Sequence, residues 1–269
     1  MTTLSARHLY KRYGAQVVLE NLSIEIKDNE FVTIVGASGC GKTTFLRLLL
    51  GEESPSEGKL LLDDKPLPAE PSPERGIVFQ RYSVFPHLTV LQNVMLGLEL
   101  RGSRWLGKLL GQSRQEAKAQ AEAMLEEVGL YAARDKYAAQ LSGGMQQRLS
   151  IAQSVITKPK ILLLDEPFAA LDPGLSADMH KLILRIWESH KLNIFMITHD
   201  LQEGFELGTR LLVFDKVRLD AQAPDAFGAT ITYDIPLHRG EQLLREVKQQ
   251  TEKTTAFVRA QKMRHLASF

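Results

Sequence analysis

The sequence predicts an α/β fold: a mostly parallel sheet covered by helices, with a helical subdomain inserted into it. Three observations support this prediction. Short apolar runs typical of strands alternate with helical patterns in the first and last thirds of the chain, the middle third has helical patterns, and a glycine-rich turn joins an early strand to a helix. A chain of 269 residues is long enough for one large domain or two modest ones.

The first predicted elements are two strands and the helix that follows them. Apolar and polar residues alternate along 19–28, as in a half-buried strand, whereas 30–36 is a continuous apolar run, as in a buried one. Residues 42–51 have a helical pattern that ends at Gly51. Further short strands are expected at 59–64 and 76–80.

From about Val84 to Val155 the pattern changes to helices, which are clearest at 89–102 and 113–130. Strand patterns then return. The strands are expected at 161–167, 193–200 and 210–216, and the longest helix between them at 174–190. Strands that alternate with helices form a parallel sheet covered on both faces. The middle helical block is therefore predicted to be a subdomain inserted into an α/β core.

The overall charge and the cysteine content narrow the class of protein. The formal net charge is +1, so no global field attracts the chain to nucleic acid or to anionic lipid. Cys40 is the only cysteine, which excludes an internal disulfide and fits a reducing cytosol. We expect no secretory signal, and no run approaches the ~18 apolar residues of a membrane span. If the protein serves a membrane, we expect it to dock onto another protein there.

Three segments each allow two interpretations. Residues 101–114 are basic and slightly amphipathic, which suits a solvated loop or a contact with a partner or lipid. Tyr82, Phe85 and Leu88 belong either to buried core or to an apolar groove that receives a partner helix. Residues 240–266 predict a C-terminal helix that packs on the core or guards an interface.

The glycine-rich turn is a phosphate-binding motif, because residues 36–43 fit the pattern G-x-x-x-x-G-K-[ST] and lie between a predicted strand and a predicted helix. Glycines let several backbone N–H groups point at one phosphate chain, and the helix adds its positive end. Lys42 can reach the β and γ phosphates, and the Thr43 hydroxyl can ligate Mg²⁺. The predicted ATP-binding residues here are Gly36, Ala37, Ser38, Gly39, Cys40, Gly41, Lys42, Thr43 and Thr44.

Polar residues follow three predicted strands, at the edge of the sheet where ligands bind in such folds. Asp165 and Glu166 come directly after an apolar run; we expect Asp165 to hold Mg²⁺ and Glu166 to orient or deprotonate a water. His199 follows another strand and can contact the γ-phosphate. Gln80 ends a third strand, where its amide can sense Mg²⁺ or the attacking water. Asp200 is expected to cap the helix that follows it.

A second glycine-rich helix start occurs at 141–148, Leu-Ser-Gly-Gly-Met-Gln-Gln-Arg. Ser142 can cap this helix, and an apolar stripe follows at Met145, Leu149, Ala152 and Val155. Helix starts bind anions, and the expected anion is ATP. Because this segment lies in the helical subdomain, we expect it to reach the ATP of a second copy of the chain, placed head to tail.

This combination of motifs resembles the ATP-binding subunit of ABC transporters, whose signature is an LSGGQ-type sequence. The resemblance extends to about residue 230. It implies a P-loop NTPase core with a mostly parallel sheet, an N-terminal antiparallel β part and the inserted helical subdomain. The domain organisation it implies is an ABC ATPase domain over 1–230, made of a nucleotide-binding core at 1–83 and 156–230 and a helical signature subdomain at 84–155, followed by a strand and helix extension at 231–269.

The resemblance also implies a role for each matching residue. Tyr13 matches the aromatic residue that stacks on adenine, Glu166 the catalytic base and His199 the switch histidine. Gln80 matches the glutamine that relays between Mg²⁺ and the membrane subunits, so the expected Mg²⁺ ligands are Thr43, Gln80 and Asp165. The residues that match those contacting the partner's ATP site are Ser142, Gly143, Gly144 and Asp172.

The resemblance implies an ATPase that dimerises around two ATP molecules with Mg²⁺ and drives a separate membrane permease. Its overall look is similar to the nitrate, taurine and sulfonate importers, which implies a solute-binding protein as a further partner and the cytoplasmic face of the membrane as the location. Met145, Gln153 and Gly208-Thr209 depart from the family pattern, so the cargo stays open. The alternatives are an exporter or lipid-trafficking subunit and a soluble ABC ATPase without transport. An unrelated P-loop kinase or GTPase is disfavoured, because such an enzyme has no need of the second glycine-rich helix start at 141–148.

Overall fold

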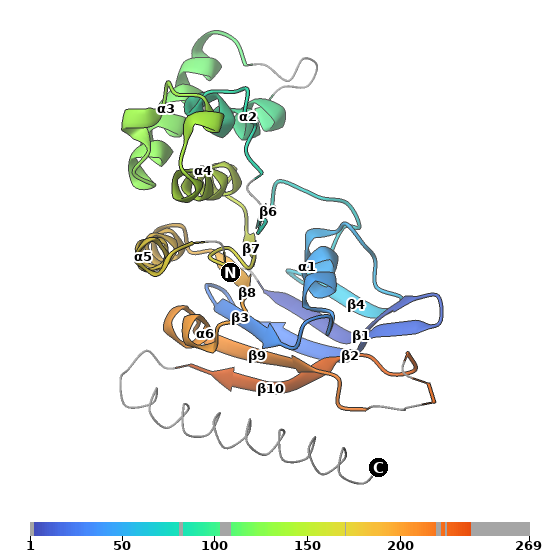
Figure 1. Ribbon diagram of the computed structural model, residues 1–269. Helices are drawn as coiled ribbons and strands as arrows, with labels where there is room; N and C mark the ends of the chain where they lie inside the picture. Colours follow the sequence, from blue (N-terminus) through green and yellow to red (C-terminus); the bar gives the residue numbers. More distant parts are fainter. Residues whose placement is uncertain are drawn as a thin grey trace.

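The computed structural model describes residues 3–80, 83–102, 109–169, 171–218, 222–223 and 225–237. These residues form two sheets with a helix between them and a helical lobe on one side (Figure 1). The helix expected at 240–266, and Ser103 to Lys108 of the basic segment, lie outside the described residues. The α/β fold with an inserted helical lobe is as the sequence predicts.

The smaller sheet is antiparallel, with the strand order β2-β1-β4-β5. Its strands are β1 (Leu4–Tyr13), β2 (Gln16–Ile26), β4 (Glu57–Leu62) and β5 (Lys65–Pro66). In β2 the side chains of Leu22, Ile24 and Ile26 are buried while Ser23 and Glu25 are exposed, which confirms the predicted alternation. This sheet is the N-terminal antiparallel part that the family resemblance implies.

The larger sheet has the order β10-β9-β3-β8-β7-β6 and is parallel except for β10. Its strands are β3 (Phe31–Gly36), β6 (Arg75–Val78), β7 (Ile161–Asp165), β8 (Asn193–Ile197), β9 (Arg210–Asp215) and β10 (Thr230–Pro236). Residues 161–164 and 193–197 are all buried, because both faces of the sheet are covered. The three strands that carry Gly36, Asp165 and Ile197 therefore end at one edge.

Helix α1 (Lys42–Leu50) lies between the two sheets (Figure 1). It ends at Gly51, as predicted, with a left-handed φ of 82°. A Cβ at this position would lie 2.7 Å from the carbonyl oxygen of Pro68 and 2.9 Å from that of Glu70, so only glycine fits. Phe45 packs against Phe195 of β8 and Phe214 of β9, which fixes the helix, and the loop before it, to the parallel sheet.

The opposite face of the parallel sheet is covered by α5 (Pro173–His190) and by the helical lobe. The lobe contains α2 (Val90–Gly102), α3 (Gly111–Glu127), α4 (Gly143–Val155) and the short 3₁₀ turns Tyr131–Ala133 and Ala138–Gln140. Its apolar residues form one continuous core with α5 and that face of the sheet. Within the lobe, α4 lies nearest the sheet (Figure 1).

Asp200 caps the start of helix α6 (Leu201–Leu207). Its Oδ1 accepts a hydrogen bond from the Gln202 backbone N–H at 2.7 Å. The predicted cap is confirmed. None of the helices in the described ranges is long and apolar enough to cross a bilayer.

Candidate nucleotide site

The loop between β3 and α1 is shaped by its glycines. Gly39 and Gly41 have left-handed φ values of 78° and 93°, which side chains with a Cβ rarely adopt. A Cβ on Gly36 would lie 2.2 Å from the carbonyl oxygen of Phe214, so only glycine fits at this position, where β3 passes into the loop. Nζ of Lys42 donates to the carbonyl oxygens of Gly36 at 2.8 Å and Ala37 at 2.9 Å, which closes the loop around the ammonium group.

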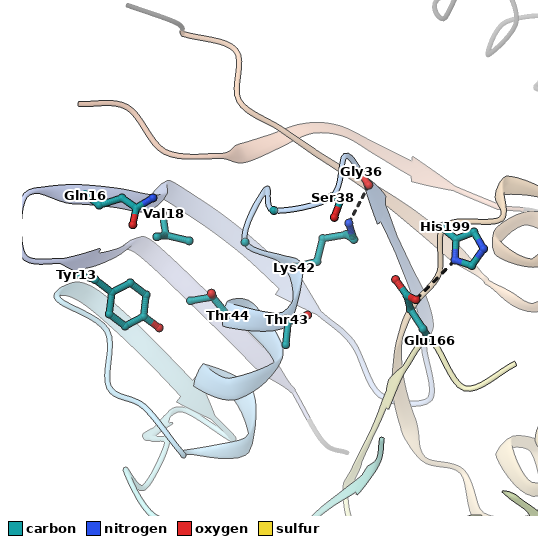
Figure 2. A pocket seen from close by; sticks show the side chains of 12 residues that line it. Tyr13, Gln16, Val18, Gly36, Ser38, Lys42, Thr43, Thr44, Glu166 and His199 are labelled. Atoms are coloured by element: carbon teal, nitrogen blue, oxygen red, sulfur yellow. Dashed lines mark hydrogen bonds and ion pairs between the residues drawn. The ribbon is translucent and has the colours of Figure 1, made fainter. Parts of the chain in front are cut away.

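A cleft of about 380 Å³ opens beside this loop (Figure 2). Tyr13 lies at one end of it, the loop in the middle, and Glu166 and His199 at the other end. The residues that line it are Tyr13, Gln16, Val18, Gly36, Ser38, Gly39, Gly41, Lys42, Thr43, Thr44, Glu166 and His199. Ten of these twelve were predicted as site residues from the sequence, all but Gln16 and Val18, and segments far apart in the chain thus meet in one place.

The aromatic end of the cleft is held by charged neighbours. The Tyr13 hydroxyl donates to Glu53, and Nζ of Lys11 lies 4.9 Å from the centre of the Tyr13 ring. Lys11 also pairs with Glu53 at 2.9 Å. Burial and the bond to Glu53 raise the pKa of Tyr13, so the ring stays neutral. Tyr13 as a whole is 43% exposed, and its flat ring is a surface that a base can stack on.

At the other end, Asp165 lies at the tip of β7, beside the Thr43 hydroxyl. Burial raises the pKa of Asp165, and the neighbouring Glu166 carboxylate raises it further, while Thr43 and Lys42 oppose the shift. The carboxylate and the hydroxyl are oxygen donors of the kind that Mg²⁺ prefers. A divalent cation at this point would favour the charged form of Asp165 and relieve its repulsion with Glu166.

Glu166 is the residue whose geometry the sequence did not predict. Its φ is 46°, in the left-handed region, and its backbone N–H donates to the Ile197 carbonyl of β8 at 3.0 Å. Nε2 of Gln80 lies 3.4 Å from its Oε2. Nδ1 of His199 lies 3.7 Å from the same oxygen (Figure 2). The structure therefore brings together the three residues that we assigned to catalysis.

The segment that carries His199 is fixed by residues that sequence reasoning missed. The buried Thr198 hydroxyl donates to Glu203 of α6 at 2.6 Å and accepts from the Asp200 backbone N–H at 3.0 Å. His180 of α5 lies 3.6 Å from the other oxygen of Glu203. Burial alone would raise the pKa of Glu203, but the bonds from His180 and Thr198 outweigh it and lower that pKa. The charged carboxylate thus ties α5, α6 and the loop of His199 together.

The start of α4 lies apart from this cleft. Oγ of Ser142 accepts a hydrogen bond from the Met145 backbone N–H, which confirms the predicted cap. Ser142 and Gly143 are exposed, but no residue of α4 is among those that line the cleft. Asp172 is exposed as well, where it caps α5 by accepting from the Leu175 N–H at 3.0 Å.

The loop after Gln80 presents an apolar ring from a rigid backbone. Phe85 is 43% exposed, yet its N–H and carbonyl are bonded to the side chain of Asn93, which is buried. Gln153 of α4 donates to Oδ1 of Asn93 at 2.9 Å. The glutamine that departs from the family pattern therefore supports this loop. Tyr82 lies outside the described residues.

The departure from the family pattern at Gly208-Thr209 also has a structural reason. Thr209 forms two hydrogen bonds with the backbone of Phe31 at the start of β3. Its Oγ1 accepts from the Phe31 N–H at 2.9 Å, and its own N–H donates to the Phe31 carbonyl at 2.7 Å. A Cβ on Gly208 would lie 2.8 Å from Oγ1 of Thr33. Thr209 thus joins the start of β9 to the start of β3, and glycine at 208 leaves room for Thr33. Neither residue lines the cleft.

The loop on β3, the cationic end of α1 and the acids on β7 define a P-loop nucleotide-binding protein. Comparison with known proteins narrows this class. A family model described as ABC transporter matches residues 19–169. An uncharacterized ABC transporter ATP-binding protein of Methanocaldococcus jannaschii is 41% identical over 214 residues, which cover 77% of this chain and 76% of that protein.

The aliphatic sulfonates import ATP-binding protein SsuB 1 of Burkholderia cenocepacia is 42% identical over 216 residues, which cover 80% of this chain and 62% of that protein. Among solved structures, the dimeric structure of MJ0796, a bacterial ABC transporter cassette, aligns with a TM-score of 0.70 and 26% identity, over 88% of this chain and all of that one. The chain belongs to the ABC transporter family. It is an ATP-binding subunit, and its family hydrolyses ATP to power transport.

Proposed function

We propose that two copies of this chain close around two ATP molecules, so that each site combines the cleft of one copy with the start of α4 of the other. One observation supports this most directly. Ser142 and Gly143 expose a capped helix start suited to an anion, yet α4 contributes nothing to its own chain's cleft. A dimeric structure of a similar cassette is consistent with such a pairing.

Within the proposed site each group has one task. Tyr13 stacks on adenine, the backbone N–H groups of 36–44 and Lys42 bind the phosphates, and Glu166 acts as general base on a water. Thr43 and Asp165, with Gln80 nearby, are the residues that would hold Mg²⁺, which neutralises phosphate charge. His199, beside Glu166, holds the γ-phosphate, and Asp172 lies at the interface between the copies.

We further propose that the transporter is an importer of a small anion or of an organic nitrogen or sulfur compound. The sulfonate-import relative, at 42% identity, supports this assignment. The permease would bind over the loop that presents Phe85, a solute-binding protein would deliver the cargo, and the subunit would lie peripherally at the cytoplasmic face of the membrane. An exporter would place the same loop against a permease of different architecture.

The substitution Ser142→Arg tests the shared site. The arginine would occupy the surface that faces the partner's ATP but would leave the chain's own cleft intact. We expect ATP binding to the monomer within about twofold of wild type, while ATP-driven dimerisation and hydrolysis fall by at least roughly 10²-fold. Fluorescent nucleotide titration, light scattering and phosphate release measure the three quantities.

Ser113→Arg is the control, because Ser113 is another exposed serine near the start of a helix of the same lobe, in the first turn of α3. It should behave as wild type in all three measurements. If Ser142→Arg hydrolyses ATP normally, the shared site is wrong.

A further inference from the structure

Gln147 lies on the buried face of α4, little more than one turn after the helix start. Its side chain is fully buried, and its Nε2 donates to the carbonyl oxygen of Pro167 at 2.7 Å. Its Oε1 has no hydrogen-bond partner within the described part of the chain. A buried polar group with an unpaired oxygen costs free energy, so an apolar residue would suit the packing better unless the bond to Pro167 serves a purpose.

The carbonyl that Gln147 binds belongs to the residue directly after Glu166. The segment is therefore held from two sides: the N–H of Glu166 bonds the Ile197 carbonyl of β8, and the carbonyl of Pro167 bonds α4 through Gln147. Proline fixes its own φ and has no N–H of its own. With φ of Pro167 fixed, ψ of Pro167 is the only soft torsion between its carbonyl and the Glu166–Pro167 peptide bond, so a displaced carbonyl can act on the left-handed backbone of Glu166.

A second bond joins α4 to the parallel sheet, but at the far end of the helix. Oγ of Ser154 donates to the carbonyl of Ile77 in β6 at 2.7 Å. This bond lies near the connection from α4 to β7, whereas Gln147 lies near the free start of the helix. If the start of α4 moves, the Ser154 bond therefore holds the end of the helix on β6, while the Gln147 bond moves Pro167 with the helix start.

We propose that Gln147 is a positioning residue that couples the two ATP sites of the proposed dimer. When the partner's ATP binds the start of α4, the helix start shifts, and the Gln147 amide carries Pro167 and Glu166 into register with the chain's own ATP. The inference rests on the shared site proposed above. Coupling of this kind is reciprocal, so each bound ATP favours the active arrangement of the other site.

The test uses Gln147→Met in the full chain. Methionine has similar volume and fills the same buried space, but it cannot donate a hydrogen bond. We expect kcat to fall by roughly 10- to 100-fold, because the base is no longer held in place. KM and ATP-driven dimerisation should stay within about twofold, and the Hill coefficient for ATP should fall from above 1 to about 1.

Two control variants separate this role from ordinary packing. Gln146→Met makes the same change at the neighbouring residue, whose amide bonds the Ala138 and Leu141 carbonyls inside the helical lobe. Ser154→Ala removes the other bond between α4 and the sheet. Both variants should keep the wild-type kcat and Hill coefficient.

Gln147→Leu provides a second probe, since leucine also fills buried space and cannot donate a hydrogen bond, and it should show the same loss of kcat. If either folded variant keeps the wild-type kcat and Hill coefficient, the coupling role is wrong. Loss of folding in both, measured by thermal unfolding, would make Gln147 a structural residue and would also overturn the proposal. A wild-type chain that hydrolyses ATP as a monomer would instead reject the shared site, whatever position 147 does.

Discussion

Glu166 combines an exposed function with a constrained backbone. Its φ of 46° is unusual for glutamate, and the strain is held by the bond to Ile197 on one side and by Pro167 on the other. Its carboxylate points into the cleft beside His199 (Figure 2). Nε2 of Gln80 lies within 3.4 Å of it. A strained residue that aims a carboxylate at a nucleotide cleft fits a general base better than it fits a structural role.

Glu166→Gln should therefore keep ATP binding and lose hydrolysis. The amide has the same size and can occupy the same position, but it cannot accept the proton of the attacking water. We expect kcat to fall by about 10²- to 10⁴-fold in a phosphate-release assay. ATP affinity, measured by nucleotide titration, should stay within a few-fold of wild type.

Glu74→Gln is the control, because Glu74 pairs with Lys160 on the surface. It should leave kcat unchanged. Near-normal turnover in Glu166→Gln would show that another group activates the water.

At the residue scale, the sequence predicted the candidate site residues but not the buried side chains that hold neighbouring loops in place. The phosphate loop, the acids at the end of β7 and the histidine after β8 were predicted because motif spacing and apolar strands are local signals. Gln147, Asn93 and Glu203 were missed, because what distinguishes them is burial and a partner far along the chain. Asn93 gave a weak signal as a polar residue in an apolar helical stretch.

Strand β10 is the element whose place the sequence left open. It pairs antiparallel with β9, from Thr230 opposite Asp215 to Pro236 opposite Arg210. Arg210 forms a double hydrogen bond with Asp234, at 2.6 and 2.7 Å, and also bonds Glu30. The bonds to Asp234 and Glu30 outweigh burial and raise the pKa of Arg210, so its charge is permanent.

Asp234→Asn should loosen this strand. The asparagine can replace only one of the two charge-assisted bonds. We expect the free energy of unfolding to fall by about 1 kcal/mol, or the midpoint of thermal unfolding by roughly 2–4 °C. Circular dichroism during heating measures the change.

The matched control is Asp135→Asn, which removes an exposed aspartate that lies 3.6 Å from Nε of Arg134. An isolated exposed pair of this kind contributes little, so its midpoint should stay within about 1 °C. An equal effect in the two variants would mean that Asp234 contributes no more than an ordinary surface charge.

Elements with strong periodicity were predicted and confirmed, including β3, β7, β8 and α1. Each of these elements has a run of apolar residues that is buried on one or both faces, and the spacing of apolar residues in the sequence reflects which faces are buried. Strand β1 gave no clear pattern, because bulges shift its register against β2 and β4.

On the scale of the whole molecule, Phe85 lies on the loop that connects the α/β core to the helical lobe, since this loop follows β6 and precedes α2. The buried Asn93 fixes the loop backbone, so the ring is exposed in a defined position. A rigid, half-exposed aromatic ring at such a connection suits contact with a protein that must sense movement between the core and the lobe.

Phe85→Asp should uncouple transport from hydrolysis. The backbone bonds to Asn93 do not depend on the side chain, so we expect the ATPase rate of the isolated subunit to stay within about twofold. Solute uptake by the assembled transporter in vesicles should fall by at least tenfold, because a charge would be buried in the contact. Val217→Asp, at an apolar residue that is 64% exposed beyond β9, should affect neither. An unaffected uptake rate in Phe85→Asp would place the permease elsewhere.

The position of β3 at the centre of the parallel sheet has a consequence for synthesis. Its neighbours β8 and β9 come much later: Glu30 meets Asn193, 163 residues on, and Phe31 meets Thr209, 178 residues on. At about 5–20 residues per second, the ribosome makes the partners of this apolar strand roughly 10–35 s after the strand itself. The antiparallel sheet, complete within the first quarter of the chain, can close long before. Nascent chains therefore carry an unpaired apolar strand for most of their time on the ribosome, and protection against aggregation matters most during that interval.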